Sequence, residues 1–302
     1  MTQGVMFHHF HGNKHAKSQG SISNIQLTKM VRFLKKNYNL LSADEFLSKS
    51  IKKKLNKSDI CLTFDDGLKC QYDVAFPVLK KEKIKAFFFI YSSTFDKKFN
   101  LMEVFRNFSN SCFKNIDNFY QSFFSKFKKT NFKKFIKLEK KFKKNYLKDY
   151  KFYSVNDRKY RFARDIVLSK KEYEIIVLKM MKDKRFNYKK KFRSLFMSKK
   201  DIKSLIKNKN IVGLHSHNHF VNISKINSTI QKKDYIKNYY FLKKNFNIKP
   251  VAASYPFGRY NLETLKIMRK LKIQIAFLSK KENKSSNLTI GRLDHANLIK
   301  KI

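Results

Sequence analysis

The sequence predicts an α/β fold built on a parallel sheet. Two observations support this prediction: seven short apolar segments recur along the chain, and helical patterns separate several of them. The segments are rich in β-branched and aromatic residues, and polar or turn residues follow each one. They span residues 5–10, 60–64, 86–91, 211–215, 251–255, 274–278 and 288–293.

Helical patterns cover residues 24–37 and 262–271 between these candidate strands. The expected apolar face of the first comprises Ile25, Leu27, Met30, Val31 and Leu34. Because strands that alternate with helices pair in parallel, we expect a sheet with crossover helices. In a barrel of this kind, the active-site residues lie at the carboxyl ends of the strands.

The segment at residues 96–200 interrupts the alternation. It is rich in Lys, Phe and Tyr, has helical spacing and contains few turn residues. We therefore predict a single catalytic domain, residues 1–302, with a helical insertion at residues 96–200. The aromatic residues of the insertion are expected to form the buried stripe of a small helical subdomain, and stacking on a substrate is the alternative.

The composition is strongly basic, with 69 Lys and Arg against 22 Asp and Glu and a formal net charge of +47. Clustered basic residues attract nucleic acids and anionic membranes. Here the excess is spread along the chain and accompanies much Asn, Ile, Phe and Tyr, as in AT-rich codon usage. We expect no specific nucleic-acid partner, but some salt-dependent attraction to anionic glycans or an anionic membrane face.

The expected location is the cytoplasm. Cys61, Cys70 and Cys112 are odd in number and lack metal-ligand spacing, so a disulfide framework is not expected. The amino terminus has no leader-like apolar run, and the longest apolar block, residues 86–91, is too short to span a bilayer. We therefore expect a protein that is neither secreted nor membrane-spanning.

Two adjacent carboxylates, Asp65 and Asp66, follow the second candidate strand and precede Gly67. Neighbouring side chains of an extended segment point in different directions, so one carboxylate can bind a metal while the other handles a proton. An ordinary turn at the end of a strand is the alternative.

A cluster of histidines follows the fourth candidate strand. Histidines four apart can reach one ion, and a catalytic zinc commonly takes three protein ligands, such as two His and one carboxylate. Asp66, His215 and His219 fit this pattern. His217 is expected to point away or to support the ligands, and Ser216 to hold the loop by bonding to backbone.

Four further histidines lie near the amino terminus. His8 and His9 follow the first candidate strand, and we expect one of them, assigned as His9, to touch the substrate. A structural histidine at the barrel end is the alternative. His11 and His15 are expected to be exposed to solvent.

These motifs resemble those of the polysaccharide deacetylase (NodB-homology, carbohydrate esterase family 4-like) family. TFDDG at residues 63–67 resembles its first motif, and HSHNH at residues 215–219 matches its second. SYPFG at residues 254–258 is similar to its Pro-Tyr/Phe-Gly turn. The resemblance covers most of the chain outside the insertion and implies a distorted (β/α)7 barrel.

The resemblance also implies roles for the matched residues. Asp65 would be the catalytic base, while Asp66, His215 and His219 would hold a divalent metal, with Zn²⁺ as the expected ion. The metal would acidify a water, and Asp65 would accept its proton as it attacks the acetamide carbonyl. The metal and the backbone N–H of Phe257 would stabilise the resulting oxyanion.

Other roles are carried over from weaker matches. His295 ends a Leu-x-His match to the last family motif and would protonate the leaving amine. A surface histidine is the alternative. Tyr255 and Phe257 could line the sugar subsite or pack beneath the turn.

The sequence departs from the family pattern in two places. Ser254 stands where the family commonly has an Arg that orients the base, and the chain has no Trp for the fourth motif. Arg292, at the end of the last candidate strand, is our candidate for the missing cation. We group it with His9, Tyr255 and Phe257 as residues of the substrate pocket.

The predicted function is metal-dependent removal of an N-acetyl group from an amino sugar of a surface polysaccharide or its precursor, so an acetylated glycan is the expected partner. A deformylase or an O-deacetylase would use the same machinery. One alternative is a catalytically inactive glycan-binding relative, motivated by the missing Arg and Trp. Another is a basic protein that binds nucleic acid or anionic surfaces on a barrel scaffold.

Overall fold

A parallel sheet forms the centre of the fold in the computed structural model, which describes residues 3–12, 14–96, 101–148, 153–281 and 286–299. The strands are ordered β7-β6-β5-β4-β3-β1-β8, and a short β2 pairs with β3. Their bounds are β1 (Gly4–Phe7), β2 (Asn39–Leu40), β3 (Asp59–Phe64), β4 (Phe87–Ile90), β5 (Ile211–Leu214), β6 (Ala252–Ser254), β7 (Ile275–Phe277) and β8 (Arg292–Asp294). Each of the seven predicted segments contains or overlaps a strand.

The sheet curves into a nearly closed barrel. Val5 of β1 is aligned with Leu62 of β3 on one side and with Leu293 of β8 on the other. Beyond β7, the Leu278 amide donates to the Ile290 carbonyl at 2.9 Å, which joins β7 to the segment before β8. The predicted distorted seven-stranded barrel is therefore confirmed, and β2 is an additional strand.

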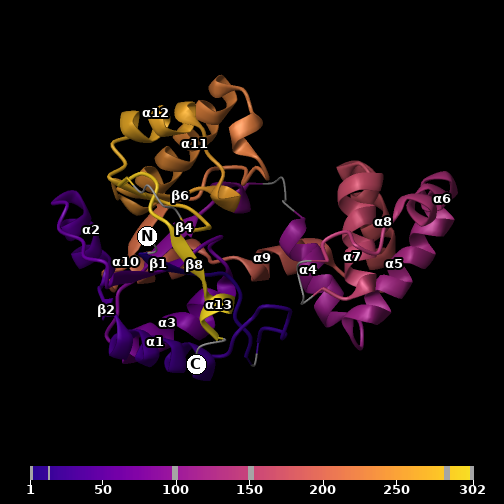
Figure 1. The fold of residues 1–302 in the computed structure, drawn as a ribbon, viewed down its shortest axis with the longest axis horizontal. Helices are drawn as coiled ribbons and strands as arrows, with labels where there is room; N and C mark the ends of the chain where they lie inside the picture. Colours follow the sequence, from indigo (N-terminus) through magenta and orange to yellow (C-terminus); the bar gives the residue numbers. More distant parts are fainter. Residues whose placement is uncertain (1–2, 13, 97–100, 149–152, 282–285, 300–302) are drawn as a thin grey trace. The chain divides into compact units, whose positions relative to one another are not determined.

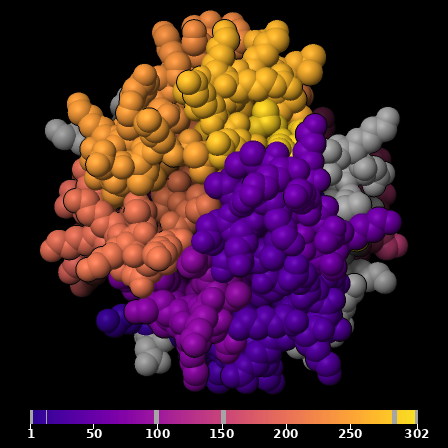
Figure 2. Space-filling model, turned by 90° about the vertical axis from the view of Figure 1, so that its left-hand side faces the viewer, coloured from indigo at the N-terminus to yellow at the C-terminus, as the bar shows by residue number. Residues whose placement is uncertain are grey.

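Helices surround the barrel strands (Figure 1). They are α1 (Asn24–Asn37), α2 (Ala43–Ile51), α3 (Phe76–Lys81), α10 (Lys199–Lys207), α11 (Ser228–Phe246), α12 (Leu262–Lys270) and α13 (His295–Ile299). Figure 1 places α11 and α12 on one side of the strands and α1 and α3 on the other. In Figure 2, the indigo and purple amino-terminal residues lie directly against the orange and yellow carboxyl-terminal residues. Both ends of the chain therefore build the same unit.

Helix α1 has the predicted bounds. The Ser23 hydroxyl accepts from the Gln26 amide, and the Gln26 side chain accepts from the Ser23 amide, which closes a capping box. The buried face comprises Leu27, Met30, Val31 and Leu34. Ile25 is 66% exposed, so its assignment to this face was wrong. At about 100° per residue, Ile25 lies about 200° around the helix from Leu27.

Aromatic side chains pack on both faces of the sheet. The Phe64 ring stacks between Phe7, at 5.2 Å, and Phe88, at 4.7 Å, while Phe87 packs against Phe277 at 5.3 Å. All five side chains are fully buried. Because neighbouring residues of a strand face opposite sides, consecutive phenylalanines in β4 serve both layers. This packing fixes the strand ends that carry the site.

Residues Leu101–Phe192 form a second compact unit. It contains α4 (Met102–Ser111), α5 (Ile116–Thr130), α6 (Phe132–Lys141), α7 (Val155–Phe162), α8 (Lys170–Asp183) and the start of α9 (Tyr188–Leu195). Phe108, Phe119, Phe123 and Phe127 are buried in its core, as expected for packing aromatics. Of the predicted insertion, residues 97–100 and 149–152 lie outside the described residues, and the single-domain assignment stays a prediction.

None of the helices formed by the described residues combines the length and the apolar character needed to cross a membrane.

Candidate metal centre

The two adjacent acids lie at a reversal of the backbone just beyond β3. Asp66 has φ 80° and Gly67 has φ 64°, both in the left-handed region. A Cβ on Gly67 would lie 2.8 Å from Ile90 Cδ1, so both conformation and space favour glycine here. The reversal gives the buried carboxylates of Asp65 and Asp66 different partners.

Asp65 forms a buried bidentate ion pair with Arg292. Nη1 of Arg292 donates to Oδ1 at 2.8 Å and Nη2 donates to Oδ2 at 2.7 Å. The Ser254 hydroxyl also donates to Oδ2, at 3.0 Å. Burial by itself raises the pKa of Asp65, but the positive charges of Arg292 and then His215 lower that pKa to about 2. Asp65 is therefore an ionised carboxylate held in one orientation.

Arg292 uses its other donors within the protein as well. Its Nε donates to the Leu278 carbonyl at 2.6 Å, and its Nη atoms donate to the Thr63 and Ser254 hydroxyls at 2.9 and 2.8 Å. With both hydrogen bonds to Asp65, all five N–H groups of the guanidinium are occupied. Arg292 therefore supplies a buried cation beside Asp65 and Ser254, as expected for the missing cation, and its donors are all used within the protein.

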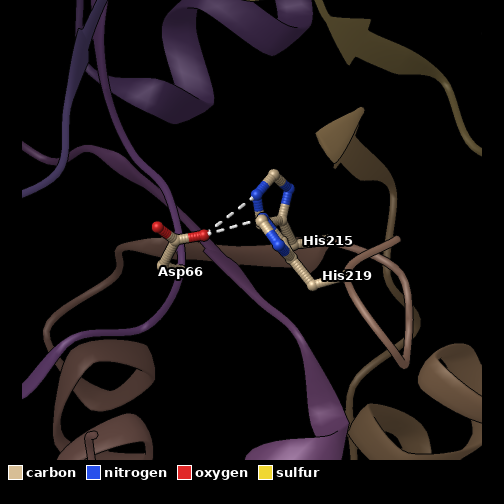
Figure 3. Close-up of side chains that lie close together, drawn as sticks. All are labelled: Asp66, His215 and His219. Carbon is tan, nitrogen blue, oxygen red and sulfur yellow. Dashed lines mark ion pairs between the residues drawn. The ribbon is translucent and has the colours of Figure 1, made fainter. Parts of the chain in front are cut away.

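Asp66, His215 and His219 converge on one point (Figure 3). Oδ1 of Asp66 lies 3.3 Å from Nε2 of His215 and 3.1 Å from Nε2 of His219. All three residues are buried. Burial by itself raises the pKa of Asp66, but His219 and His215 lower that pKa well below its usual range. The carboxylate is therefore ionised and faces both imidazoles.

These residues fit a divalent metal. Oδ1 of Asp66 is buried and has no hydrogen-bond partner among the described residues, as expected of an atom that serves as a ligand. Nδ1 of His215 lies 2.8 Å from the Ser254 carbonyl oxygen, which fixes the proton on Nδ1 and leaves the Nε2 lone pair toward Asp66. Two imidazoles and one carboxylate form a common donor set of catalytic zinc sites.

The histidine loop is held by its own side chains. Ser216 and His219 have φ values of 61° and 51°, and the Ser216 hydroxyl accepts from the His219 amide at 3.0 Å. The expected loop-holding role of Ser216 is thus observed. Nδ1 of His217 lies 2.8 Å from the Ser92 hydroxyl and its Nε2 lies 3.2 Å from Asp96, so this imidazole is bound outside the group formed by Asp66, His215 and His219.

Of the two aromatic residues in the Tyr-Pro-Phe-Gly segment, one lies beside the site. Phe257 is 46% exposed, and its ring lies 5.2 Å from the His219 ring. Tyr255 is fully buried, and its hydroxyl donates to the Leu288 carbonyl at 3.0 Å. The structure therefore favours the packing alternative for Tyr255, while Phe257 stays available to a ligand.

His295 is buried beside β1. Its Nε2 lies 2.9 Å from the Gly20 carbonyl oxygen, and its ring stacks on Phe7 at 5.4 Å. The expectation that it could be an ordinary surface histidine is therefore wrong. Its Nδ1 makes no hydrogen bond within the described residues.

His8 and His9 lie side by side after β1, and the assignment of His9 to substrate contact stays a prediction. Burial lowers the pKa of His8, and the carboxylates of Asp66 and Asp65 raise it. Burial outweighs the carboxylates, so the pKa of His8 is lowered overall, and the influence of both carboxylates means that His8 lies near them. The His9 ring lies 6.2 Å from that of His8.

His11 and His15 are half-buried, contrary to the expected exposure. Nδ1 of His11 lies 2.9 Å from the Ser21 hydroxyl, and Nε2 of His15 lies 2.9 Å from the Asp73 carboxylate. His11 therefore braces the loop after β1 internally, and His15 ties that loop to Asp73.

Comparisons with known proteins agree with this geometry. The model of the polysaccharide deacetylase family matches residues 52–113 and 171–276. The Streptococcus pyogenes deacetylase PplD is similar in structure, with 17% identity, a TM-score of 0.56 and coverage of 99% of this chain and 96% of that one. IcaB from Ammonifex degensii has 15% identity and a TM-score of 0.58, covering 97% and 91%. A de-N-acetylase from Aggregatibacter actinomycetemcomitans has 14% identity and a TM-score of 0.57, covering 97% and 94%. No curated protein sequence matches significantly.

Proposed function

This chain belongs to the polysaccharide deacetylase family, and we propose that it is a metal-dependent hydrolase that removes an N-acetyl group from an amino sugar of a surface polysaccharide or its precursor. The observation that carries the proposal is the convergence of Asp66, His215 and His219 beside an ionised carboxylate that Arg292 holds in place. A binding protein would not need a base fixed in this way next to a metal-ligand set.

Asp66, His215 and His219 are the proposed ligands, and Zn²⁺ is the proposed ion. A bound divalent cation supplies Lewis acidity, which polarises an acyl carbonyl and acidifies water. The partly exposed ring of Phe257 lies beside His219, and the backbone N–H of Phe257 is the proposed oxyanion donor.

Asp65 is the proposed base. A base must be ionised and must present a free lone pair in a fixed direction. The bidentate pair with Arg292 meets the first need and, together with the Ser254 hydroxyl, fixes the carboxylate plane. The low pKa of Asp65 keeps its carboxylate ionised at neutral pH, so it is able to accept a proton.

His295 is the proposed proton donor to the leaving amine. The bond from Nε2 to the Gly20 carbonyl fixes one proton on that nitrogen. Nδ1, which makes no hydrogen bond within the described part of the chain and lies 3.4 Å from Oδ1 of Asp294, is therefore the atom that would gain and lose the catalytic proton. His8, which lies near the same carboxylates, joins His9 as a candidate for substrate contact.

Release of acetate tests the proposal directly. Zinc-loaded protein is incubated with a panel of acetylated nucleotide sugars and lipid-linked saccharides, and released acetate is measured by mass spectrometry. The matched control is Asp65→Asn, which leaves the proposed ligands in place. Stoichiometric zinc without acetate from any member of the panel would favour the inactive glycan-binding relative.

A further inference from the structure

The loop that carries the two histidine ligands rests on one face of α11. Two of its residues adopt left-handed φ, and an unsupported loop would not hold this conformation, because a non-glycine residue pays a steric cost there. Two side chains of α11, Asp234 and Asn238, bind the loop backbone. They are four residues apart and therefore lie on the same side of the helix.

Asp234 holds the middle of the loop. Its Oδ2 accepts from the His217 amide at 2.8 Å, and its Oδ1 accepts from the Asn218 amide at 2.9 Å and from the Asn218 side chain at 2.8 Å. Asp234 is only 3% exposed. A buried carboxylate must be compensated, and here three N–H groups of the loop provide that compensation. Both carboxylate oxygens of Asp234 therefore bind the loop between His215 and His219.

Asn238 holds the start of the loop and ties it to the sheet. Its Oδ1 accepts from the His215 amide at 3.0 Å, and its Nδ2 donates to the Ile90 carbonyl at the end of β4, also at 3.0 Å. The side chain is fully buried. One amide group therefore fixes the backbone of a ligand relative to the strand beside it.

Residues 92–96 make a second set of contacts with the loop. The Ser93 amide donates to the His217 carbonyl at 3.0 Å, and the His217 ring lies against Ser92 and Asp96. Lys237 of α11 pairs with the same Asp96 at 3.0 Å. Helix α11 therefore binds the amides of His217 and Asn218. Residues 92–96 bind the carbonyl and the imidazole of His217.

We propose that Asp234 and Asn238 are positioning residues that set the spacing of His215 and His219 before a metal binds. The inference rests on the proposed metal site and deepens it. Neither side chain contacts the ligand atoms, so both act through the loop backbone. Without them, the two imidazoles would have to be ordered at the moment of binding, and the cost would appear as weaker metal affinity.

The test measures zinc affinity with a competing chelator in wild-type protein, Asp234→Asn, Asn238→Ala and Asn238→Asp. Loss of supporting hydrogen bonds around a metal site typically weakens affinity about 10–100-fold, and we expect this range for Asp234→Asn and Asn238→Ala. Asn238→Asp keeps the acceptor for the His215 amide and should recover part of the loss. The absorption spectrum of the Co²⁺-loaded protein should shift in the two weak variants, because ligand geometry changes.

The matched control is Asp201→Asn. Asp201 is a buried carboxylate of the same unit, 8% exposed, which caps α10 through Ser198 and pairs with Lys69. The Asp201→Asn substitution should lower the melting temperature of the metal-free protein without changing its zinc affinity. The proposal is overturned if Asp234→Asn and Asn238→Ala bind zinc as tightly as wild type, or if Asp201→Asn weakens binding as much as they do.

The result for Asp234 and Asn238 can be distinguished from the result for the proposed deacetylase function. Failure of wild-type protein to bind zinc would remove the metal site itself. Zinc binding by wild type without acetate release would remove the deacetylase, while the comparison of affinities would still decide the role of Asp234 and Asn238.

Discussion

The pair formed by Asp65 and Arg292 joins residues 227 positions apart in the sequence, and both side chains are almost completely buried. Such a pair is costly to desolvate and is stabilised only because its hydrogen bonds are complete. Thr63 and Ser254 supply the hydroxyls that complete them. The pair therefore holds one side of the site rigidly, and its two members can be tested separately.

Asp65→Asn should retain bound zinc and lose turnover, because Asp65 is adjacent to the ligand set but is not part of it. General-base catalysis typically contributes about 10²–10⁴-fold, and a loss of kcat in that range is expected. Zinc content by elemental analysis and acetate release from the same preparation provide the measurement. Turnover close to wild type would remove Asp65 from the mechanism.

Arg292→Met should destabilise the protein strongly. It leaves the buried Asp65 carboxylate uncompensated, and breaking a buried pair in this way typically costs about 3–5 kcal/mol. Urea unfolding followed by circular dichroism measures the change. Arg164→Met is the control, because Arg164 pairs with Asp165 at a site where that carboxylate is 40% exposed, and such pairs contribute at most about 1 kcal/mol. Equal effects of the two substitutions would contradict the assigned role of Arg292.

His215→Ala should lose bound metal and activity together, since it removes one of three proposed ligands. The readouts are zinc stoichiometry after dialysis and acetate release. Val221→Ala is a suitable control, because Val221 lies close to the same loop in sequence and is 65% exposed. Stoichiometric metal in His215→Ala would refute the ligand assignment.

The sequence revealed the members of this site that lie in compact motifs. Asp66, His215 and His219 could be grouped because each follows an apolar segment and zinc chemistry favours the set. His8 and His9 could not be separated, since the orientation of neighbouring side chains depends on where β1 ends. Asp234 and Asn238 gave no signal, because polar residues on a helix are ordinarily solvated and only the fold brings these two against the loop.

At the scale of elements, the strands were predictable because apolar runs at strand positions must be buried. β2 escaped the prediction because it has only two residues. The last strand was placed at residues 288–293, whereas β8 spans Arg292–Asp294. The reason is that the amides of Ala276 and Leu278 bond to Asn287 and Ile290, so the apolar residues before β8 extend the edge of β7 and close the barrel.

A pH-sensitive contact links two helices of the second unit. The Glu172 carboxylate at the start of α8 pairs with Lys134 of α6 at 2.6 Å and accepts from the Ser169 amide and hydroxyl, both at 2.8 Å. Lys134, followed by Ser169, lowers the pKa of Glu172 to about 2, from its ordinary value of 4.5. Since the folded-state pKa is below the unfolded one, this contact stabilises the unit fully above pH 4.5 and loses its effect as the pH falls toward 2.

Glu172→Gln should therefore lower the melting temperature at neutral pH and flatten its dependence on pH in that acidic window. Thermal unfolding followed by circular dichroism across the window is the measurement. Glu174→Gln is the control, because Glu174 reaches Lys170 only at 3.9 Å. If the two variants give the same pH profile, the contact of Glu172 does not link the helices in solution.

For the whole molecule, the charge of +47 remains to be interpreted. The buried site is independent of it, because Asp66, His215 and His219 lie inside the barrel unit and make their contacts there. Composition alone does not indicate whether the positive charge binds a partner. Basic residues spread along a chain can result from AT-rich codon usage as well as from selection for binding. Diffuse attraction to anionic surfaces and a dedicated binding function can be compared by varying the salt concentration and by removing the metal site.

We expect the protein to bind vesicles containing anionic lipid at low ionic strength and to be released as salt rises. Screening shortens the range of charge interactions from about 30 Å at 0.01 M salt to about 3 Å at 1 M, so diffuse attraction should disappear well before the upper limit. Co-sedimentation across a salt series is the measurement, with vesicles of neutral lipid as the control. Asp66→Ala should bind the vesicles as wild type does, because the attraction comes from surface charge. Salt-sensitive binding of nucleic acid that survives Asp66→Ala would instead support a barrel that serves as a scaffold for a basic binding protein.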